Sequence, residues 1–219
     1  MNIHKSINNL IEIDENLKLK VLHSKKPKII AVSKTFPIED IKPLINHGHI
    51  DFGENKVQEA VFKWTDIKLD FNYIKLHMIG KLQTNKVKYV IPIFDYIHTL
   101  DNIRLAEKIA NEQIKKDKRL KIFVQVNIGH EDQKNGIEVK NLTNFYNKCI
   151  TEYQLDIVGL MCIPPISPNP KAFFLKMKEL SDSIHIPELS MGMSEDYIEA
   201  AINGSTYLRI GSKIFGKRD

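Results

Sequence analysis

The sequence predicts a (β/α)8 barrel of the TIM type with one extra helix at its N-terminus. Short apolar segments alternate with longer amphipathic segments along the 219 residues, which is typical of a parallel sheet covered by helices. The alternation gives eight strand–helix units, the number that closes a barrel. The alternative, an open doubly wound sheet, should carry a glycine-rich turn after its first strand, and the turn Ser33-Lys34-Thr35-Phe36-Pro37 has no glycine.

We expect one domain over residues 1–219, with the N-terminal helix inside residues 1–24 and the barrel over residues 28–219. The N-terminal helix is predicted over residues 3–22, where apolar residues recur near helical spacing. The predicted strands, which share short apolar runs, cover residues 28–32, 49–52, 75–79, 95–99, 121–128, 157–161, 188–190 and 207–210.

The predicted helices follow these strands in order and carry apolar residues on one face. They cover residues 37–48, 57–66, 84–90, 102–115, 139–151, 171–183 and 195–203, and a C-terminal turn follows the last strand. Pro37 suits the first position of its helix, Gly48 suits its end, and Pro43 predicts a kink or an early break. The proline-rich stretch over residues 164–170 is expected to be a stiff loop at the barrel mouth.

Composition limits the possible function classes. The chain is 42% hydrophobic and 27% charged, as in a soluble globular domain, and its net charge of +5 is spread over scattered lysines. We therefore expect a solvated basic surface that suits an anionic ligand, and no nucleic-acid partner, because no arginine-rich block occurs. Cys149 and Cys162 lack metal-ligand spacing, which indicates free thiols in a reducing compartment and no metal site. No apolar run approaches the ~18–20 residues that span a bilayer, so a cytoplasmic protein without membrane contact is expected.

Lys34 is the first candidate for chemistry. It directly follows the first predicted strand, and active residues of barrels lie at the carboxyl ends of strands. A neutral lysine amine can attack an aldehyde to form an imine, although a lysine at this place can also be simply solvated.

Two turns rich in small residues follow the last two strands, where barrels often hold phosphate. One turn contains Ser190, Gly192 and Ser194, and the other contains Gly211 and Ser212. Hydroxyls and backbone N–H groups at such turns can cradle an anion, although Ser194 could equally cap the helix that follows it. Together the two turns favour a phosphate site.

A lysine facing a phosphate cradle suits pyridoxal 5′-phosphate, a cofactor with both an aldehyde and a phosphate. Arg209, on the last strand, is placed to face the pyridine nitrogen, although it could instead form a salt bridge. Because a guanidinium stays cationic, it would disfavour protonation of that nitrogen and weaken the ring as an electron sink.

Six sequence blocks together resemble the pyridoxal phosphate homeostasis protein family. They occur in matching order from about residue 28 to the C-terminus: Ala31-Val32-Ser33-Lys34-Thr35, Phe52-Gly53-Glu54-Asn55 with Gln58-Glu59, His77-Met78-Ile79-Gly80 with Leu82-Gln83-Thr84-Asn85-Lys86, Gly159-Leu160-Met161, Leu189-Ser190-Met191-Gly192-Met193-Ser194, and Arg209-Ile210-Gly211-Ser212 with Ile214-Phe215-Gly216. The resemblance implies a barrel similar to the N-terminal domain of bacterial alanine racemase. It also implies a role in vitamin B6 homeostasis, holding the cofactor without robust turnover.

The resemblance also implies roles for individual residues. Lys34 matches the Schiff-base lysine, Arg209 the arginine facing the pyridine nitrogen, and Asn55 an asparagine near the cofactor. The phosphate-binding positions are matched by Ser194, Gly211 and Ser212, with Ser190 beside them. His77 and Met161 end predicted strands, so they are expected to line the mouth.

Two departures from the family pattern are small. Ser212 replaces a common threonine and keeps its hydroxyl, and Lys213 follows where a small residue is usual, which adds charge near the phosphate or simply faces solvent.

Two other functions stay open. A racemase would use Lys34 as one of two acid/base groups, but no tyrosine sits in a motif that assigns it as the second. A barrel aldolase would use Lys34 on a sugar phosphate. For the leading interpretation we expect a monomer, since a closed barrel has no sheet edge to cover, with apo-enzymes that use the cofactor as transient partners.

Overall fold

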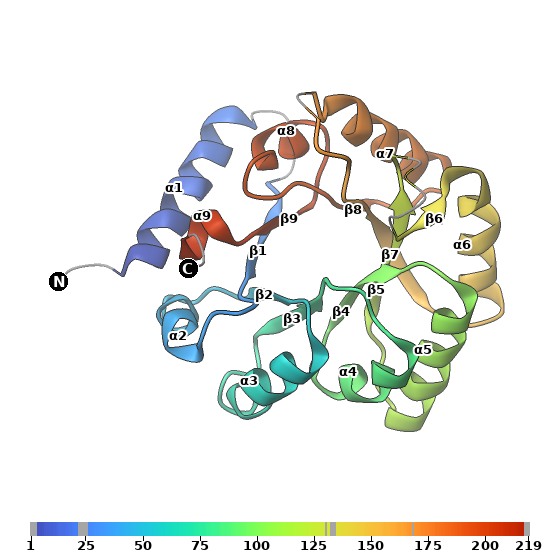
Figure 1. The fold of residues 1–219 in the computed structure, drawn as a ribbon, viewed down its shortest axis with the longest axis horizontal. Coiled ribbons are helices and arrows are strands. Elements are labelled where there is room, and N and C mark those ends of the chain that lie inside the picture. Colours follow the sequence, from blue (N-terminus) through green and yellow to red (C-terminus); the bar gives the residue numbers. More distant parts are fainter. Residues whose placement is uncertain (1–3, 22–25, 130, 132–134, 168, 217–219) are drawn as a thin grey trace.

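The computed structural model describes residues 4–21, 26–129, 131, 135–167 and 169–216, and it confirms the barrel (Figure 1). Eight parallel strands form the order β4-β3-β2-β1-β9-β8-β7-β5, and pairing between β4 and β5 closes the ring. Helices surround this ring on its outside. The closed ring also rejects the open doubly wound alternative, which has two free sheet edges.

The barrel strands are short, and most of their residues are buried on both faces. They are β1 (Lys28–Val32), β2 (Asp51–Glu54), β3 (Lys75–Met78), β4 (Tyr96–Leu100), β5 (Lys121–Asn127), β7 (Asp156–Met161), β8 (Glu188–Ser190) and β9 (Tyr207–Ile210). A two-residue strand that the sequence did not predict, β6 (Ile137–Glu138), pairs with the end of β5 outside the ring.

The helices follow the strands as expected for a barrel. They are α1 (Lys5–Lys20), α2 (Ile38–Asn46), α3 (Val57–Asp70), α4 (Val87–Ile93), α5 (Ile103–Lys116), α6 (Leu142–Thr151), α7 (Lys171–Ser183), α8 (Tyr197–Ile202) and α9 (Ser212–Phe215). One-turn 3₁₀ helices, η1 (Thr84–Lys86) and η2 (Val139–Asn141), precede α4 and α6 and account for the first residues of two predicted helices.

Several predicted boundaries are wrong by a few residues. Strand β2 begins at Asp51 rather than residue 49, because the N–H of His49 still bonds to Leu44 of helix α2. Helix α2 begins at Ile38, after Pro37, and it continues past Pro43 without a break. Helix α8 begins at Tyr197, two residues after the predicted start.

Two groups of buried side chains form the core. The larger group fills the layer between the strands and the helices and includes Trp64, Phe94 and Phe174. The smaller group lies inside the barrel and consists of Ile30, Tyr96, Phe123, Met161 and Tyr207. The barrel is therefore a packed core, and a ligand must bind at one of its ends.

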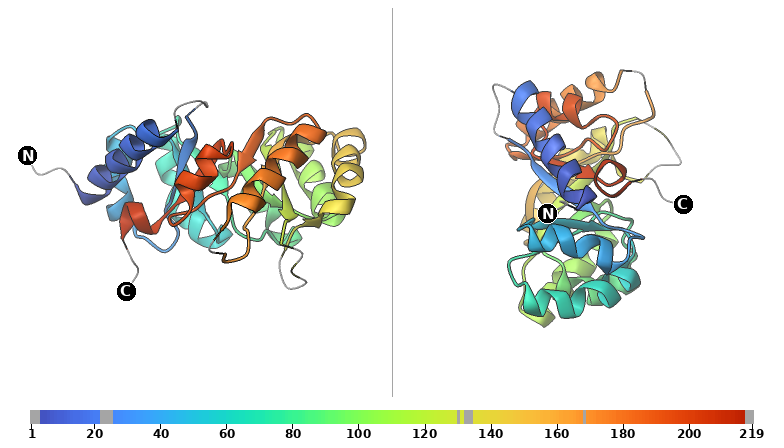
Figure 2. Two further views of the ribbon diagram at one scale, coloured as in Figure 1. Left: turned by 90° about the horizontal axis from the view of Figure 1, so that it is seen from above. Right: turned by 90° about the vertical axis from the view of Figure 1, so that its left-hand side faces the viewer.

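Helix α1 lies outside the barrel and packs against the C-terminal helix α9 (Figures 1 and 2). The side-chain amide of Asn9 donates to the carbonyl of Ile214 at 2.9 Å, which fixes α9 against α1. The predicted ends of the first helix, residues 3 and 22, lie outside the described residues. Among the helices that the structure describes, none has the length and apolar character needed to cross a membrane.

Candidate functional site

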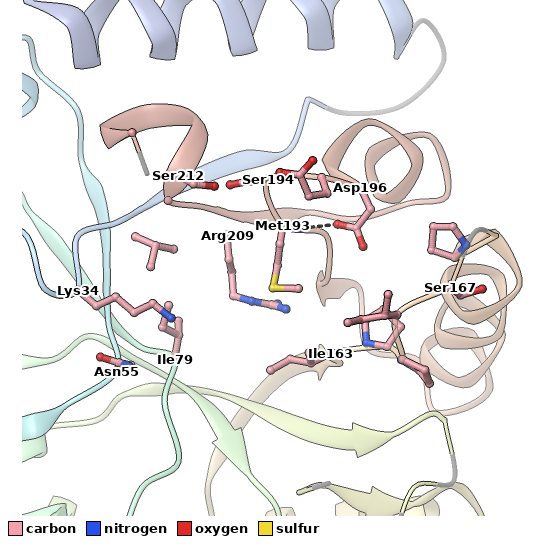
Figure 3. Close-up of a pocket in the computed structure, with 18 of the residues that line it drawn as sticks. Lys34, Asn55, Ile79, Ile163, Ser167, Met193, Ser194, Asp196, Arg209 and Ser212 are labelled. Atoms are coloured by element: carbon pink, nitrogen blue, oxygen red, sulfur yellow. Dashed lines mark hydrogen bonds between the residues drawn. The ribbon is translucent and has the colours of Figure 1, made fainter. Parts of the chain in front are cut away.

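A cavity of about 960 Å³ opens at the carboxyl ends of the barrel strands, the end where barrels place their chemistry. Lys34, Asn55, Ser194, Arg209, Gly211 and Ser212 all line this cavity, so six of the seven predicted site residues meet in one place. Figure 3 shows Lys34 and Arg209 extending into the cavity, with the hydroxyls of Ser194 and Ser212 near each other along one side. The cavity also includes the proline-rich loop, in which Pro164, Pro165 and Pro170 form a stiff apolar wall.

Lys34 and Arg209 are neighbours because their strands pair. Strands β1 and β9 run parallel, with Ile30 opposite Arg209 and Ala31 opposite Ile210. Lys34 is half-buried and follows the end of β1 by two residues. Adjacent strands therefore bring an amine and a guanidinium to the same cavity.

A strained turn holds Lys34. Thr35 has φ of 68°, in the left-handed region that a β-branched residue rarely adopts. Its N–H donates to Oε1 of Glu59 at 2.5 Å, and the carbonyl of Ser33 accepts from Nζ of Lys63 at 3.0 Å. Helix α3 thus contacts the backbone on both sides of Lys34, and these contacts stabilise the strained turn.

A buried ion pair between Lys63 and Glu54 lies beneath that turn. The Nζ atom of Lys63 lies 2.9 Å from Oε1 of Glu54, and the side chains are only 8% and 0% exposed. The same Oε1 accepts from the hydroxyl of Ser33 at 2.8 Å and from the indole N–H of Trp64 at 3.0 Å. A buried carboxylate with several donors is stable only while each donor stays in place.

Arg209 is almost fully buried, and its guanidinium is fixed by three hydrogen bonds to its own fold. One terminal nitrogen donates to the carbonyl and to the hydroxyl of Ser190, each at 2.7 Å. The other donates to the carbonyl of Cys162 at 2.8 Å. Burial lowers the pKa of Arg209 from its ordinary value. A guanidinium carries five N–H donors, so two have no acceptor among the described residues, and Arg209 itself lines the cavity.

The two predicted anion turns both reach the cavity. Gly192 has φ of +89°, and a Cβ at this position would lie 2.4 Å from Cβ of Ala200, so only glycine allows the turn after β8. The N–H of Met193 donates to Oδ1 of Asp196 at 2.6 Å, which orders the turn around Ser194. On the other side, α9 begins at Ser212, and the N–H of Lys213 donates to Oγ of Ser194 at 3.5 Å, which brings the two turns together.

Asn55 presents an unsatisfied oxygen. Its Oδ1 atom is buried and has no hydrogen-bond partner among the described residues, although Asn55 lines the cavity. The backbone of Asn55 is held by the loop after β3, where a Cβ on Gly80 would lie 2.2 Å from the carbonyl oxygen of Asn55. A buried oxygen without a donor is costly, so this position favours a ligand that donates a hydrogen bond or a water.

Ser190, His77 and Met161 do not line the cavity in the structure. Ser190 is fully buried below Arg209 and positions it, in place of the predicted location beside the phosphate turns. The expectation that His77 and Met161 line the mouth is wrong: both are fully buried inside the barrel. Strand side chains alternate between the two faces of a sheet, so a residue near a strand end can point into the closed interior.

Sequence reasoning missed the residues that support the site. Lys63 and Glu59 are four residues apart on one face of α3, a spacing visible in the sequence, but their contact with the turn of Lys34 depends on tertiary packing. Ile79 and Met193 line the cavity beside Lys34 and Arg209, and no motif marked them as ligand contacts. Glu195 and Asp196 bring negative charge to the cavity rim, so the site is not uniformly basic.

Comparison with known proteins identifies the family that this chain resembles. The sequence profile of the alanine racemase N-terminal domain matches residues 9–219. The pyridoxal phosphate homeostasis protein of Aquifex aeolicus is 38% identical over 201 residues, which cover 87% of each chain. The protein of the same name from Pasteurella multocida is 36% identical over 225 residues, covering 96% of this chain and 97% of the relative.

A solved structure resembles this chain over nearly its whole length. PipY of Synechococcus elongatus PCC7942, solved with PLP bound, superposes with a TM-score of 0.84 at 29% sequence identity. The superposition covers 96% of this chain and 100% of PipY.

Proposed function

The chain belongs to the alanine racemase N-terminal domain family, and on that premise we propose that it binds pyridoxal 5′-phosphate (PLP) as a Schiff base with Lys34. In this role the protein holds the reactive aldehyde reversibly and contributes to PLP homeostasis. The observation that carries the proposal is the meeting of Lys34, Arg209 and the two serine turns in one cavity. PLP binding by PipY, and the name shared by the curated relatives, support it.

The residues of the cavity fit the chemical groups of this cofactor. Lys34 supplies the amine, and the hydroxyls of Ser194 and Ser212, with the backbone at Gly211, supply donors for a phosphate. The buried, unsatisfied Oδ1 of Asn55 lies where a bound ligand or its water would satisfy it. A cavity of about 960 Å³ lies within the size range of small-molecule sites, so it would accommodate this cofactor.

Arg209 determines what chemistry the bound cofactor supplies. A cationic guanidinium donates to a neutral pyridine nitrogen and opposes its protonation, which weakens the ring as an electron sink. The two N–H groups of Arg209 that have no acceptor among the described residues would be the donors for this contact. Such a site favours holding and releasing the cofactor over demanding carbanion chemistry.

Racemisation is the alternative, and it needs a second acid/base group opposite Lys34. Among the described residues that line the cavity, none is a tyrosine. Transfer of the cofactor from this protein to apo-enzymes remains part of our proposal, as a consequence of a reversible bond at an open cavity.

The decisive experiment is reduction of the loaded protein with borohydride, followed by peptide mass analysis. We expect the pyridoxyl group on Lys34, and we expect the visible absorbance band of the imine to be absent in Lys34→Ala. A label on another lysine, or wild-type protein that never takes up added cofactor, would reject the proposal. Incubation with L-alanine and chiral analysis of the product then separates a carrier from a racemase.

A further inference from the structure

A chain of hydrogen bonds crosses the barrel interior from Arg209 to Asp51. The guanidinium of Arg209 donates to Oγ of Ser190 at 2.7 Å, and that Oγ lies 2.8 Å from Nδ1 of His98. Nε2 of His98 lies 2.9 Å from Nδ1 of His77, and Nε2 of His77 lies 3.0 Å from Oδ1 of Asp51. We call these five residues the relay.

The chemistry of the two ends sets the direction of every hydrogen bond in the relay. Ionised Asp51 can only accept, so Nε2 of His77 carries a proton and donates to it. If both rings are neutral, Nδ1 of His77 accepts from Nε2–H of His98, and Nδ1 of His98 accepts from the hydroxyl of Ser190. Ser190 then accepts from Arg209, which can only donate. Each of the four hydrogen bonds then has its donor on the side of Arg209 and its acceptor on the side of Asp51, so no contact in the relay lacks a donor or an acceptor.

Packing keeps both imidazoles neutral and oriented. The ring of His77 stacks on Tyr96 with centroids 4.2 Å apart, and the ring of His98 stacks on Phe123 at 4.3 Å. Burial lowers the pKa of His77, partly offset by Asp51 and Asp95. Burial also lowers the pKa of His98 well below its usual value, and nearby His77 and Arg209 act in the same direction.

The two ends of the relay lie at opposite ends of the barrel. Arg209 lines the cofactor cavity, whereas Asp51 begins strand β2 and lines a smaller cavity of about 370 Å³ with Lys28 and His49. The side chain of Asp51 is 17% exposed, so water reaches its carboxylate. Among the described residues, no group of three or more His, Cys, Asp or Glu side chains is placed to hold a metal ion.

We propose that Asp51, His77, His98 and Ser190 act as positioning residues that hold the guanidinium of Arg209 against the ring of the bound cofactor, with Asp51 as its distant counterion. The inference rests on the proposed cofactor but extends to residues outside the cavity. Ser190 restricts the rotation of the guanidinium, and the two imidazoles transmit the polarisation from Asp51. The relay thus makes the cofactor's electronic state depend on a carboxylate at the other end of the barrel.

The first experiment needs no cofactor. In the apo-protein, isotopic labelling of the histidine ring nitrogens allows NMR to identify the tautomers of His77 and His98 at neutral pH. We expect both rings to be neutral and protonated at Nε2. An imidazolium, or protonation at Nδ1 in either ring, overturns the relay whether or not the protein binds PLP.

The second experiment compares Asp51→Asn with Asp156→Asn. Both aspartates begin barrel strands, but Asp156 is exposed and lies outside the relay. The asparagine at position 51 still accepts from His77 through Oδ1 but lacks the charge. We expect PLP to leave Asp51→Asn about three- to tenfold faster than wild type, the effect of losing charge assistance in one hydrogen bond.

The absorbance spectrum of the bound cofactor distinguishes positioning from loss of stability. We expect its band to shift with pH in Asp51→Asn but not in wild type or Asp156→Asn, because a loosened Arg209 no longer opposes ring protonation. The relay would be overturned if Asp51→Asn kept the wild-type rate of PLP dissociation and the wild-type spectrum while Arg209→Ala changed both. If wild type binds no PLP, the proposed function fails, and the tautomer measurement alone decides the relay.

Discussion

Nζ of Lys63 lies 2.9 Å from the fully buried carboxylate of Glu54, directly beneath the turn that carries Lys34. Removing the ammonium leaves Glu54 with hydroxyl and indole donors only, and also removes the donor to the carbonyl of Ser33. We expect Lys63→Met to lower the free energy of unfolding by about 3–5 kcal/mol, as for other broken buried ion pairs. Urea denaturation measures the change.

The matched control for that variant is Lys176→Met. Lys176 pairs with Glu179 at 2.9 Å, but both side chains are more than half exposed. An exposed pair contributes at most about 1 kcal/mol, so this variant should unfold near the wild-type urea concentration. Equal losses in the two variants would show that the Lys63–Glu54 pair has no special role.

Lys34 and Arg209 should contribute unequally to cofactor retention. Lys34 forms a covalent bond in the proposed complex, whereas Arg209 contributes hydrogen bonds from a guanidinium that the fold already holds. We therefore expect Lys34→Ala to lose PLP during dialysis faster than Arg209→Ala. Retention is followed by cofactor released on alkaline denaturation, since Lys34→Ala lacks the imine band. Equal retention would count against the proposed bond.

Ser194 should recognise the phosphate specifically. Its side chain is buried at the cavity, beside the start of α9. We expect Ser194→Ala to weaken PLP binding by about 1–3 kcal/mol, the range for a hydrogen bond to a charged group, and to leave pyridoxal binding nearly unchanged. Ser167→Ala is the control, because Ser167 lines the same cavity from the proline-rich loop. A similar loss in both variants would place the phosphate elsewhere.

The unsatisfied oxygen of Asn55 predicts that its removal stabilises the apo-protein but weakens PLP binding. Leucine at this position has nearly the same shape and no buried oxygen to desolvate. We expect Asn55→Leu to raise the free energy of unfolding of the apo-protein by about 1 kcal/mol and to weaken PLP binding. Calorimetry of apo and loaded protein tests both halves, and an apo-protein that is less stable than wild type would contradict the assignment.

The buried histidines predict a loss of stability in acid. Burial lowers the pKa of His98 well below its usual value and also lowers the pKa of His77 and His49. Between the native pKa and the unfolded pKa of about 6.5, the unfolded chain binds more protons. The free energy of unfolding should therefore be highest above that pH and should fall as the pH drops below it.

Urea denaturation of wild type and His98→Gln, at neutral and mildly acidic pH, measures this dependence. The free energy of unfolding of the variant should decrease less between the two pH values, because the variant lacks one histidine whose pKa is lowered in the native state. An identical decrease in both proteins would mean that His98 is not neutral in the native state.

The sequence determined the barrel and most of the candidate site, because both depend on local signals. Apolar periodicity marks each strand, and parallel strands of a barrel end on one face, so Lys34, Asn55, Ser194, Arg209, Gly211 and Ser212 had to meet there. The tertiary structure decided how that site is supported. The contact of Lys63 with Ser33, and the relay from Arg209 to Asp51, join residues on different strands and helices. No local pattern specifies which side chains point into the closed barrel, because strand register and curvature set that direction only when the ring closes.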